Sequence, residues 1–136
     1  MQKITISSAY INFPQFLINK LNEIECDVEL ITSAPQANSF YKAGMIKGNI
    51  PKFYRLFEMN LLKKFKEKEN KQLYEFKRDG WTYHSKGIWF YENNKLEPNA
   101  TLIGSSNYSK LHLIQISGAL KEILNYSSSF TVSVTK

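Results

Sequence analysis

The first part of the chain shows two kinds of hydrophobic spacing. Residues 3–10 alternate between polar and apolar side chains, which predicts a strand. Behind Pro14, which suits the first turn of a helix, apolar residues fall three or four apart and predict a helix over about 14–24. A β-branched run at 28–32 then predicts a buried strand. This order of strand, helix and strand is typical of a βαβ unit with parallel strands.

The rest of the chain predicts one long helix and several short strands. Pro51 opens a helix over about 51–70, whose apolar residues again recur three and four apart. Its lysine-rich face and tail favour a solvated surface laced with ion pairs, with peripheral contact to an anionic membrane as the alternative. Strands are predicted at 72–76, 81–91, 100–103 and 130–134, and a weaker helix at 120–124. Together these elements predict an α/β fold with a mixed, mostly parallel sheet flanked by helices.

Composition limits the classes of protein and partner. A chain of 136 residues with 43% hydrophobic and 22% charged residues suits one globular domain, and no apolar run is long enough for a membrane-spanning helix. The net charge of +6 favours an anionic partner: a nucleic acid, a phosphorylated small molecule or an anionic lipid surface. The single cysteine, Cys26, excludes an intrachain disulfide and a multi-thiolate metal site, and we expect it to pack in the core.

Two short segments carry the candidate chemistry. His84 and Lys86 are two residues apart in a predicted strand, so both side chains should point to one face. An imidazole can act as a nucleophile or a general acid, and an ammonium beside it can bind phosphate. Behind the next strand, Gly104, Ser105 and Asn107 offer backbone amides, a hydroxyl and a side-chain amide to an anion. The combination predicts a site for phosphoryl transfer.

This pattern resembles the phospholipase D superfamily, whose motif runs His-x-Lys and then Gly-Ser-x-Asn. Three stretches narrow the resemblance to the C-terminal half of the phosphatidylglycerophosphate synthases: TSAPQANSFY at 32–41, GWTYHSKGIW at 80–89 and TLIGSSNY at 101–108. The resemblance therefore implies a phospholipase D-like half-domain over residues 1–110. The tail, 111–136, lies outside it and diverges.

The resemblance implies a specific reaction. Enzymes of this family transfer the phosphatidyl group of CDP-diacylglycerol to glycerol 3-phosphate and release CMP, a step towards phosphatidylglycerol and cardiolipin. Two His-Lys motifs, one from each half, form a single site that works through a phosphohistidine. His84 and Lys86 would be the catalytic pair of the second motif, and Ser105 and Asn107 would bind the phosphate. No cofactor, metal or nucleic acid is implied.

Several departures from the family pattern shape the expectations. Tyr91 stands where the wider superfamily has an aspartate, and the acidic pair that follows the family's motif would fall at Ile116 and Gly118. The chain also holds one matched His-Lys motif. We therefore expect a fragment whose partner is either a missing N-terminal half or a second copy, and which is inactive as a monomer. The sheet face left by a missing half should be apolar and exposed.

Some alternatives remain open on sequence alone. The basic charge also suits a phosphodiesterase or nuclease of the same superfamily, and a non-catalytic remnant would share the motifs. Gln36 and Asn38 are candidates for lining a cleft, whereas Trp81 and Trp89 are expected to pack in the core or on the sheet. A mitochondrial location is implied by the resemblance alone, because the chain shows no presequence.

Overall fold

The sheet and its helices are seen in a computed structural model, which describes residues 2–40, 44, 47–65, 68–92, 95–105, 108 and 130–133. The strands are β1 (Lys3–Ser8), β2 (Asp27–Ser33), β3 (Lys71–Phe76), β4 (Lys86–Tyr91), β5 (Ala100–Ile103) and β6 (Phe130–Ser133). The helices are α1 (Gln15–Glu23), the short 3₁₀ helices η1 (Pro35–Ala37) and η2 (Lys47–Asn49), and α2 (Ile50–Phe65).

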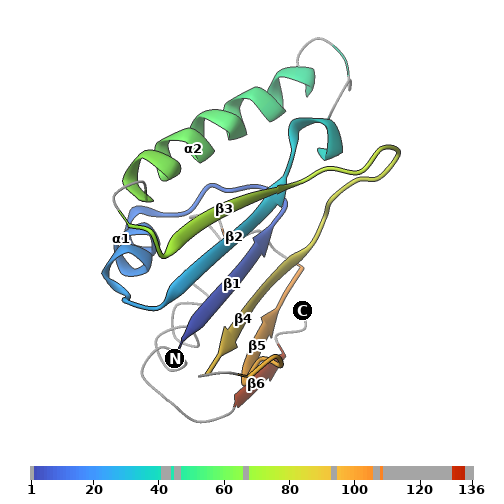
Figure 1. The fold of residues 1–136 in the computed structure, drawn as a ribbon. Coiled ribbons are helices and arrows are strands. Elements are labelled where there is room, and N and C mark those ends of the chain that lie inside the picture. Colours follow the sequence, from blue (N-terminus) through green and yellow to red (C-terminus); the bar gives the residue numbers. More distant parts are fainter. Residues whose placement is uncertain are drawn as a thin grey trace.

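The six strands form one mixed sheet in the order β3-β2-β1-β4-β5-β6 (Figure 1). The β1–β2, β2–β3 and β5–β6 pairs are parallel, and β4 runs antiparallel to both β1 and β5. The parallel pairs on one side come from two consecutive βαβ units, with α1 and α2 as the crossover helices. The predicted mixed α/β sheet is therefore confirmed, and the strand expected near 130–134 joins it as β6.

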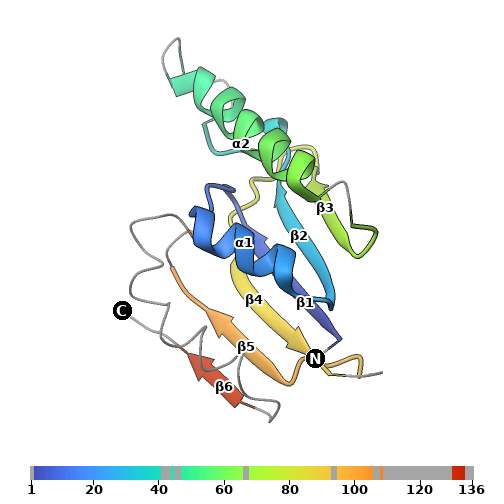
Figure 2. The same cartoon turned by 90° about the vertical axis from the view of Figure 1, so that its left-hand side faces the viewer.

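Both helices α1 and α2 pack on one face of the sheet (Figure 2). Side chains from the two helices share one apolar core with alternate residues of β1, β2, β4 and β5: Ile4, Ile6, Leu17, Leu21, Val28, Leu30, Leu61, Phe65, Ile88, Phe90 and Leu102. These strand residues are two apart because successive side chains of a strand point to opposite faces. On the other face, Thr5 and Ser7 of the central strand are also buried, although their polar character predicts exposure.

The predicted element boundaries hold for most elements and fail in two places. The helix expected over 51–70 ends at Phe65, and β3 already begins at Lys71. The strand expected over 81–91 begins only at Lys86, so residues 81–85 lie outside the sheet. The amide of Tyr83 donates to the carbonyl of Ala37 in the segment after β2, so at this residue the backbone bonds to that segment and not to a strand. The helix expected at 120–124 lies outside the described residues.

Gly87 leaves room for the indole of Trp89 on the sheet surface. Both residues belong to β4 and, being two apart, face the same side of the sheet. A Cβ atom at Gly87 would lie 2.7 Å from Cζ2 and 2.9 Å from Cζ3 of Trp89, closer than such atoms normally approach. The ring therefore lies over the glycine, and its position depends on the absence of a side chain there.

A buried carboxylate ties α2 to the end of β2. Glu58 is 3% exposed, accepts a hydrogen bond from Thr32 Oγ1 at 3.3 Å and pairs with Arg55 Nη1 at 3.4 Å. The Arg55 guanidinium also pairs with Glu75 of β3. Burial raises the pKa of Glu58, and the nearby Arg55 and Thr32 oppose that shift only in part.

We expect the substitution Gly87→Ala to lower the free energy of unfolding by about 1–3 kcal/mol, because the new methyl group displaces the Trp89 ring. Urea denaturation followed by circular dichroism measures the change. Gly104→Ala is the matched control, since a Cβ atom there meets nothing within 4 Å. Equal effects of the two substitutions would contradict the packing described for Trp89.

The raised pKa of Glu58 predicts a pH-dependent stability. A carboxyl whose pKa is higher in the folded state stabilises the fold fully below its unfolded pKa, and this contribution is lost as the pH rises through the folded pKa. The wild type should therefore lose stability relative to Glu58→Gln as the pH rises from about 4 towards neutrality. Urea denaturation of both proteins across this range measures the difference. A difference that stays constant or grows in the opposite direction would refute the prediction.

Candidate functional site

The candidate site lies at the end of the sheet where β1 ends and β4 begins. Lys86, the first residue of β4, pairs in register with Ser8, the last residue of β1. Since β2 runs parallel to β1, the loop that follows β2 reaches the same end of the sheet. Strand β3 is parallel to β2 and ends there as well, and the segment 77–85 links it to β4. Strand β5 also ends there, at Ile103 opposite Gly87.

Tyr83 fixes the chain immediately before His84. Its hydroxyl lies 2.6 Å from Ser7 Oγ of β1, and its amide donates to the carbonyl of Ala37 at 2.9 Å. Its ring stacks on Phe76 with centroids 4.9 Å apart. Three separate segments therefore hold this one residue, and the exposed His84 side chain starts from a fixed backbone.

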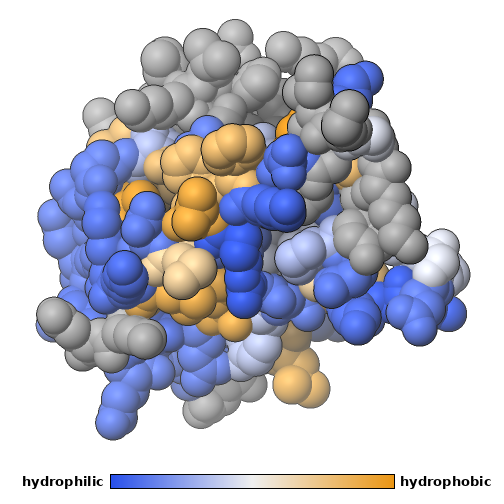
Figure 3. Space-filling view, turned by 90° about the horizontal axis from the view of Figure 1, so that it is seen from above, coloured by the Kyte–Doolittle hydropathy of each residue, from blue (hydrophilic) through white to orange (hydrophobic). Residues whose placement is uncertain are grey.

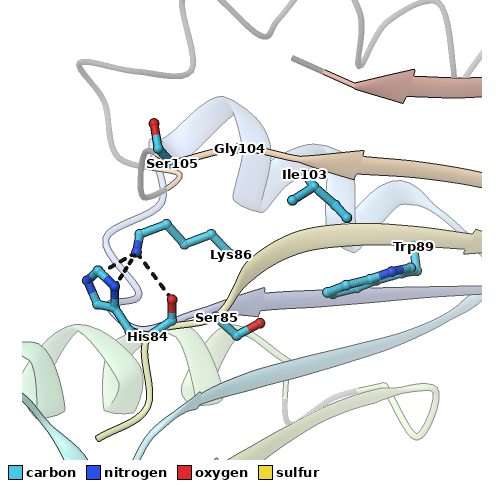
Figure 4. Close-up of a pocket in the computed structure, with 7 residues that line it drawn as sticks. All are labelled: His84, Ser85, Lys86, Trp89, Ile103, Gly104 and Ser105. Carbon is cyan, nitrogen blue, oxygen red and sulfur yellow. Dashed lines mark hydrogen bonds between the residues drawn. The ribbon is translucent and has the colours of Figure 1, made fainter. Parts of the chain in front are cut away.

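His84 and Lys86 are in direct contact (Figure 4). The Lys86 ammonium Nζ lies 3.1 Å from both Nδ1 and Nε2 of His84, and 3.4 Å from the His84 carbonyl oxygen, to which it donates. A neutral imidazole accepts from an ammonium through its unprotonated nitrogen, so either tautomer can make this bond. Partial burial lowers the pKa of the Lys86 ammonium. Among the described residues, no carboxylate pairs with Lys86.

A cavity of about 460 Å³ opens beside this pair. Its lining combines polar groups with an apolar wall: His84, Ser85, Lys86, Trp89, Ile103, Gly104 and Ser105 (Figure 4). Trp89 and Ile103 belong to neighbouring strands and form the apolar part, and Ile103 is 55% exposed. A phosphate ester with an apolar portion would satisfy both halves of this lining, because the imidazole and ammonium suit the anion and the wall suits the rest.

The structure brings together three of the predicted site residues. His84, Lys86 and Ser105 line one cavity although they come from β4, the segment before it and the segment after β5. The His84–Lys86 contact forms although His84 lies before the strand, which corrects the assumption that a strand would align the two. Asn107 lies outside the described residues.

Gln36 and Asn38, the two candidate cleft residues, lie beside the site without lining the cavity. Gln36 is an exposed residue of η1, and Asn38 is buried, with its side-chain Oδ1 accepting from the amide of Phe40 at 2.9 Å. Their connection to the site is Ala37, whose carbonyl accepts from Tyr83.

Sequence reasoning missed Tyr83 and the apolar wall. Nothing in the local sequence distinguishes Tyr83 from other aromatic residues, because its partners Ser7 and Ala37 are distant in the chain. Trp89 was expected to pack on the sheet and does so, but it also lines the cavity. The expectation that Trp81 packs in the core or on the sheet is wrong: it lies outside the strands and is 57% exposed, with the Arg78 guanidinium 4.1 Å from the ring centroid.

Among the residues that the structure describes, the other reactive groups form no second candidate site. Cys26 is half-buried beside the core, and burial raises the pKa of its thiol, which reduces its nucleophilic thiolate fraction. Within the described ranges, no three His, Cys, Asp or Glu side chains are grouped so that they could hold a metal ion. Nor does that part of the chain contain a helix with the length and apolar character needed to cross a membrane.

Comparison with known proteins identifies relatives of one named activity. The chain is 34% identical over 109 residues to the "Probable CDP-diacylglycerol--glycerol-3-phosphate 3-phosphatidyltransferase" of Dictyostelium discoideum. It is 31% identical over 109 residues to the mitochondrial CDP-diacylglycerol--glycerol-3-phosphate 3-phosphatidyltransferase of Gallus gallus. Each match covers 78% of this chain but 19% and 20% of the relative, so the chain spans about a fifth of the length of these curated relatives. No family model matches the chain.

One solved structure of a phospholipid-synthesis enzyme also resembles this chain. The crystal structure of phosphatidylserine synthase from Haemophilus influenzae matches with a TM-score of 0.59 and 29% sequence identity. The match covers 65% of this chain and 22% of that chain. The chain is therefore similar, in sequence and in fold, to parts of proteins named for phospholipid synthesis.

The anchoring of Tyr83 predicts the behaviour of Tyr83→Phe. The substitution keeps the ring against Phe76 but removes the hydroxyl that meets Ser7, which should lower the free energy of unfolding by about 1 kcal/mol. Hydrogen exchange at the amides of 82–86 should become faster.

Tyr74→Phe provides the control for this experiment. Its hydroxyl donates to Gln72 on the exposed surface of β3, so its loss should change neither quantity appreciably. If Tyr83→Phe behaved like this control, the hydroxyl contact with Ser7 would not be what holds the segment before His84.

Proposed function

We propose that this chain contributes to phosphatidyl transfer from CDP-diacylglycerol to glycerol 3-phosphate, giving phosphatidylglycerophosphate and CMP. The observation that carries the proposal is the contact between His84 and Lys86, which line a cavity with both polar and apolar walls. The names of the relatives supply the reaction, and the product leads to phosphatidylglycerol and cardiolipin.

The proposed chemistry has two balanced steps. In the first, an imidazole nitrogen attacks the phosphorus that carries diacylglycerol, the bond to the CMP oxygen breaks, and a proton from a general acid completes CMP. In the second, a hydroxyl of glycerol 3-phosphate attacks the phosphorus of the phosphohistidine, the phosphorus–nitrogen bond breaks and frees the imidazole, and the hydroxyl proton passes to the same acid–base group, now a base. His84 acts as either the nucleophile or the acid–base group.

The groups around His84 have distinct roles in this proposal. The Lys86 ammonium lies where it can bind a non-bridging oxygen of the transferred phosphate, as a compact point charge. Ser105 and Asn107 add hydrogen-bond donors, which stabilise the charge that develops in the transition state. Trp89 and Ile103 receive an apolar portion of the lipid substrate. No metal has a role in these steps.

We further propose that the chain is a phospholipase D-like half-domain that needs a partner. The mechanism requires a nucleophile and an acid on opposite sides of phosphorus, while the matched motif supplies only His84. The second histidine would come from an N-terminal half or from another copy of the chain. The names of several animal relatives include the word mitochondrial, which supports the same location for this protein.

The chain alone, at monomeric mass, should show no turnover of CDP-diacylglycerol. Labelled glycerol 3-phosphate and light scattering measure product and mass in the same sample. Turnover that appears only in a dimer would support paired His84 residues, and turnover restored by adding an N-terminal half of a relative would support the two-half arrangement. Turnover at monomeric mass would refute the need for a partner.

In whichever assembly is active, His84→Ala should reduce CMP release by at least about 10²–10⁴-fold, because it removes a nucleophile or a general acid. Steady-state release of CMP from CDP-diacylglycerol measures the loss. Lys77→Ala is the control, since Lys77 is an exposed lysine of the same loop that does not line the cavity. Near-normal release by His84→Ala would refute the assignment of the site.

A further inference from the structure

The side of α2 that faces away from the sheet is unusually apolar. The helix packs through Glu58, Leu61 and Phe65, which are at most 3% exposed. On its opposite side four large apolar residues are exposed: Phe53 at 62%, Leu56 at 57%, Phe57 at 46% and Met59 at 47%. Figure 3 looks down on this side and shows apolar side chains grouped together with hydrophilic ones beside them. Exposed apolar groups of this kind mark interaction surfaces.

The same side of α2 also carries positive charge. Lys52, Lys63 and Lys64 are exposed and share a face with the four apolar residues, because positions three, four and seven apart lie on one side of a helix. We call these seven residues the outer face of α2. The one acidic residue of the helix, Glu58, is buried on the other side. Within the described residues, Lys52 and Lys63 form no ion pair.

We propose that the outer face of α2 docks on the surface of an anionic lipid bilayer. Aromatic and aliphatic side chains can enter the boundary between headgroups and acyl chains, while lysines beside them reach the lipid phosphates. The charge is complementary, since each lysine near an anionic membrane surface contributes attraction and no carboxylate on this face opposes it.

A folded protein partner suits this face less well. Lysine is depleted from the centres of protein interfaces because its ammonium is costly to desolvate. On the outer face of α2, lysines precede and follow the apolar residues along the same side of the helix, so a protein that covered the phenylalanines would also cover ammonium groups. At a bilayer surface the same ammonium groups remain hydrated and paired with phosphate.

The position of α2 connects this surface with the candidate site. The helix starts after β2 and runs back to the start of β3, so its N-terminal half lies at the carboxyl end of these strands. His84 lies at that same end of the sheet, and the exposed apolar residues fall in the first ten positions of the helix. The inference deepens the proposed function and rests on it for the substrate, a lipid that is presented by a membrane.

Cosedimentation of the full chain with vesicles tests the docking surface. The vesicles contain phosphatidylcholine alone or phosphatidylcholine mixed with phosphatidylglycerol, and neither substrate of the transfer reaction is present. Wild type should bind the anionic vesicles strongly and the neutral ones weakly, with binding weakened by salt. The charge variant Lys52→Glu/Lys63→Glu should lower the partition coefficient at least about tenfold. The apolar variant Phe53→Ser/Phe57→Ser should also lower it about tenfold or more.

Matched control variants test whether binding depends on this face in particular, and not on the total charge or on exposed apolar side chains anywhere on the surface. Lys77→Glu/Lys95→Glu reverses two exposed lysines elsewhere, and Leu96→Ser removes a side chain that is 98% exposed on a loop. Both controls should bind like wild type. Circular dichroism should show the same fold in every variant, because each altered side chain of the outer face lies on the surface.

Three results would overturn the proposal. These are equal binding to neutral and anionic vesicles, binding that survives both outer-face variants, and a wild-type oligomer that both variants convert to monomer. The third would assign the face to a second copy of the chain. The assay contains no substrate and so tests the docking surface alone. Vesicle binding as expected, together with no phosphatidyl transfer by the dimer or by the chain supplemented with an N-terminal half, would refute the proposed function while the docking surface stood.

Discussion

The central position of β1 is the constraint on which the candidate site depends. This strand pairs in parallel with β2 and antiparallel with β4, so β2 ends and β4 begins at the same end of the sheet. The loop that contains Ala37 and the segment that contains Tyr83 are therefore neighbours, although neither is close to the other in sequence. If β4 were parallel to β1, its first residue would lie at the opposite end of the sheet. His84 and Lys86 would then be a strand length away from the loop after β2.

Local patterns predicted the elements well where tertiary contacts agree with them. The helix expected over 14–24 is α1, and the strand expected at 28–32 is the centre of β2. The alternation in β1 also predicted a strand, but it implied one exposed face, whereas Thr5 and Ser7 are buried. Thr5 donates to Glu29 of β2, and Ser7 contacts the Tyr83 hydroxyl, so these side chains meet partners from distant parts of the chain. The long helix ends at Phe65 in a lysine- and glutamate-rich stretch that gives no stop signal such as Gly or Pro.

The sequence predicted the reactive groups of the candidate site but not the residues that hold them in place or line the cavity beside them. The spacing of His84 and Lys86 and the Gly-Ser pair after the next strand identified groups that the structure collects around one cavity. The sequence pattern also placed His84 in a strand, whereas that strand begins two residues later, at Lys86. Tyr83 and the wall of Trp89 and Ile103 depend on pairing between distant segments, and that pairing is a property of the whole sheet.

The hydrogen bond between Ser7 and Tyr83 also bears on the order in which the protein folds. The two residues are 76 positions apart, so this contact closes one of the longest loops in the described chain. Contacts of such separation form slowly, because the entropy of closing the loop is lost before the contact compensates for it. During synthesis β1 leaves the ribosome well before β4, so the side of β1 that pairs with β4 stays open until residue 91 has followed. The βαβ units can therefore fold early, whereas His84 and Lys86 reach their positions only after β4 has paired with β1.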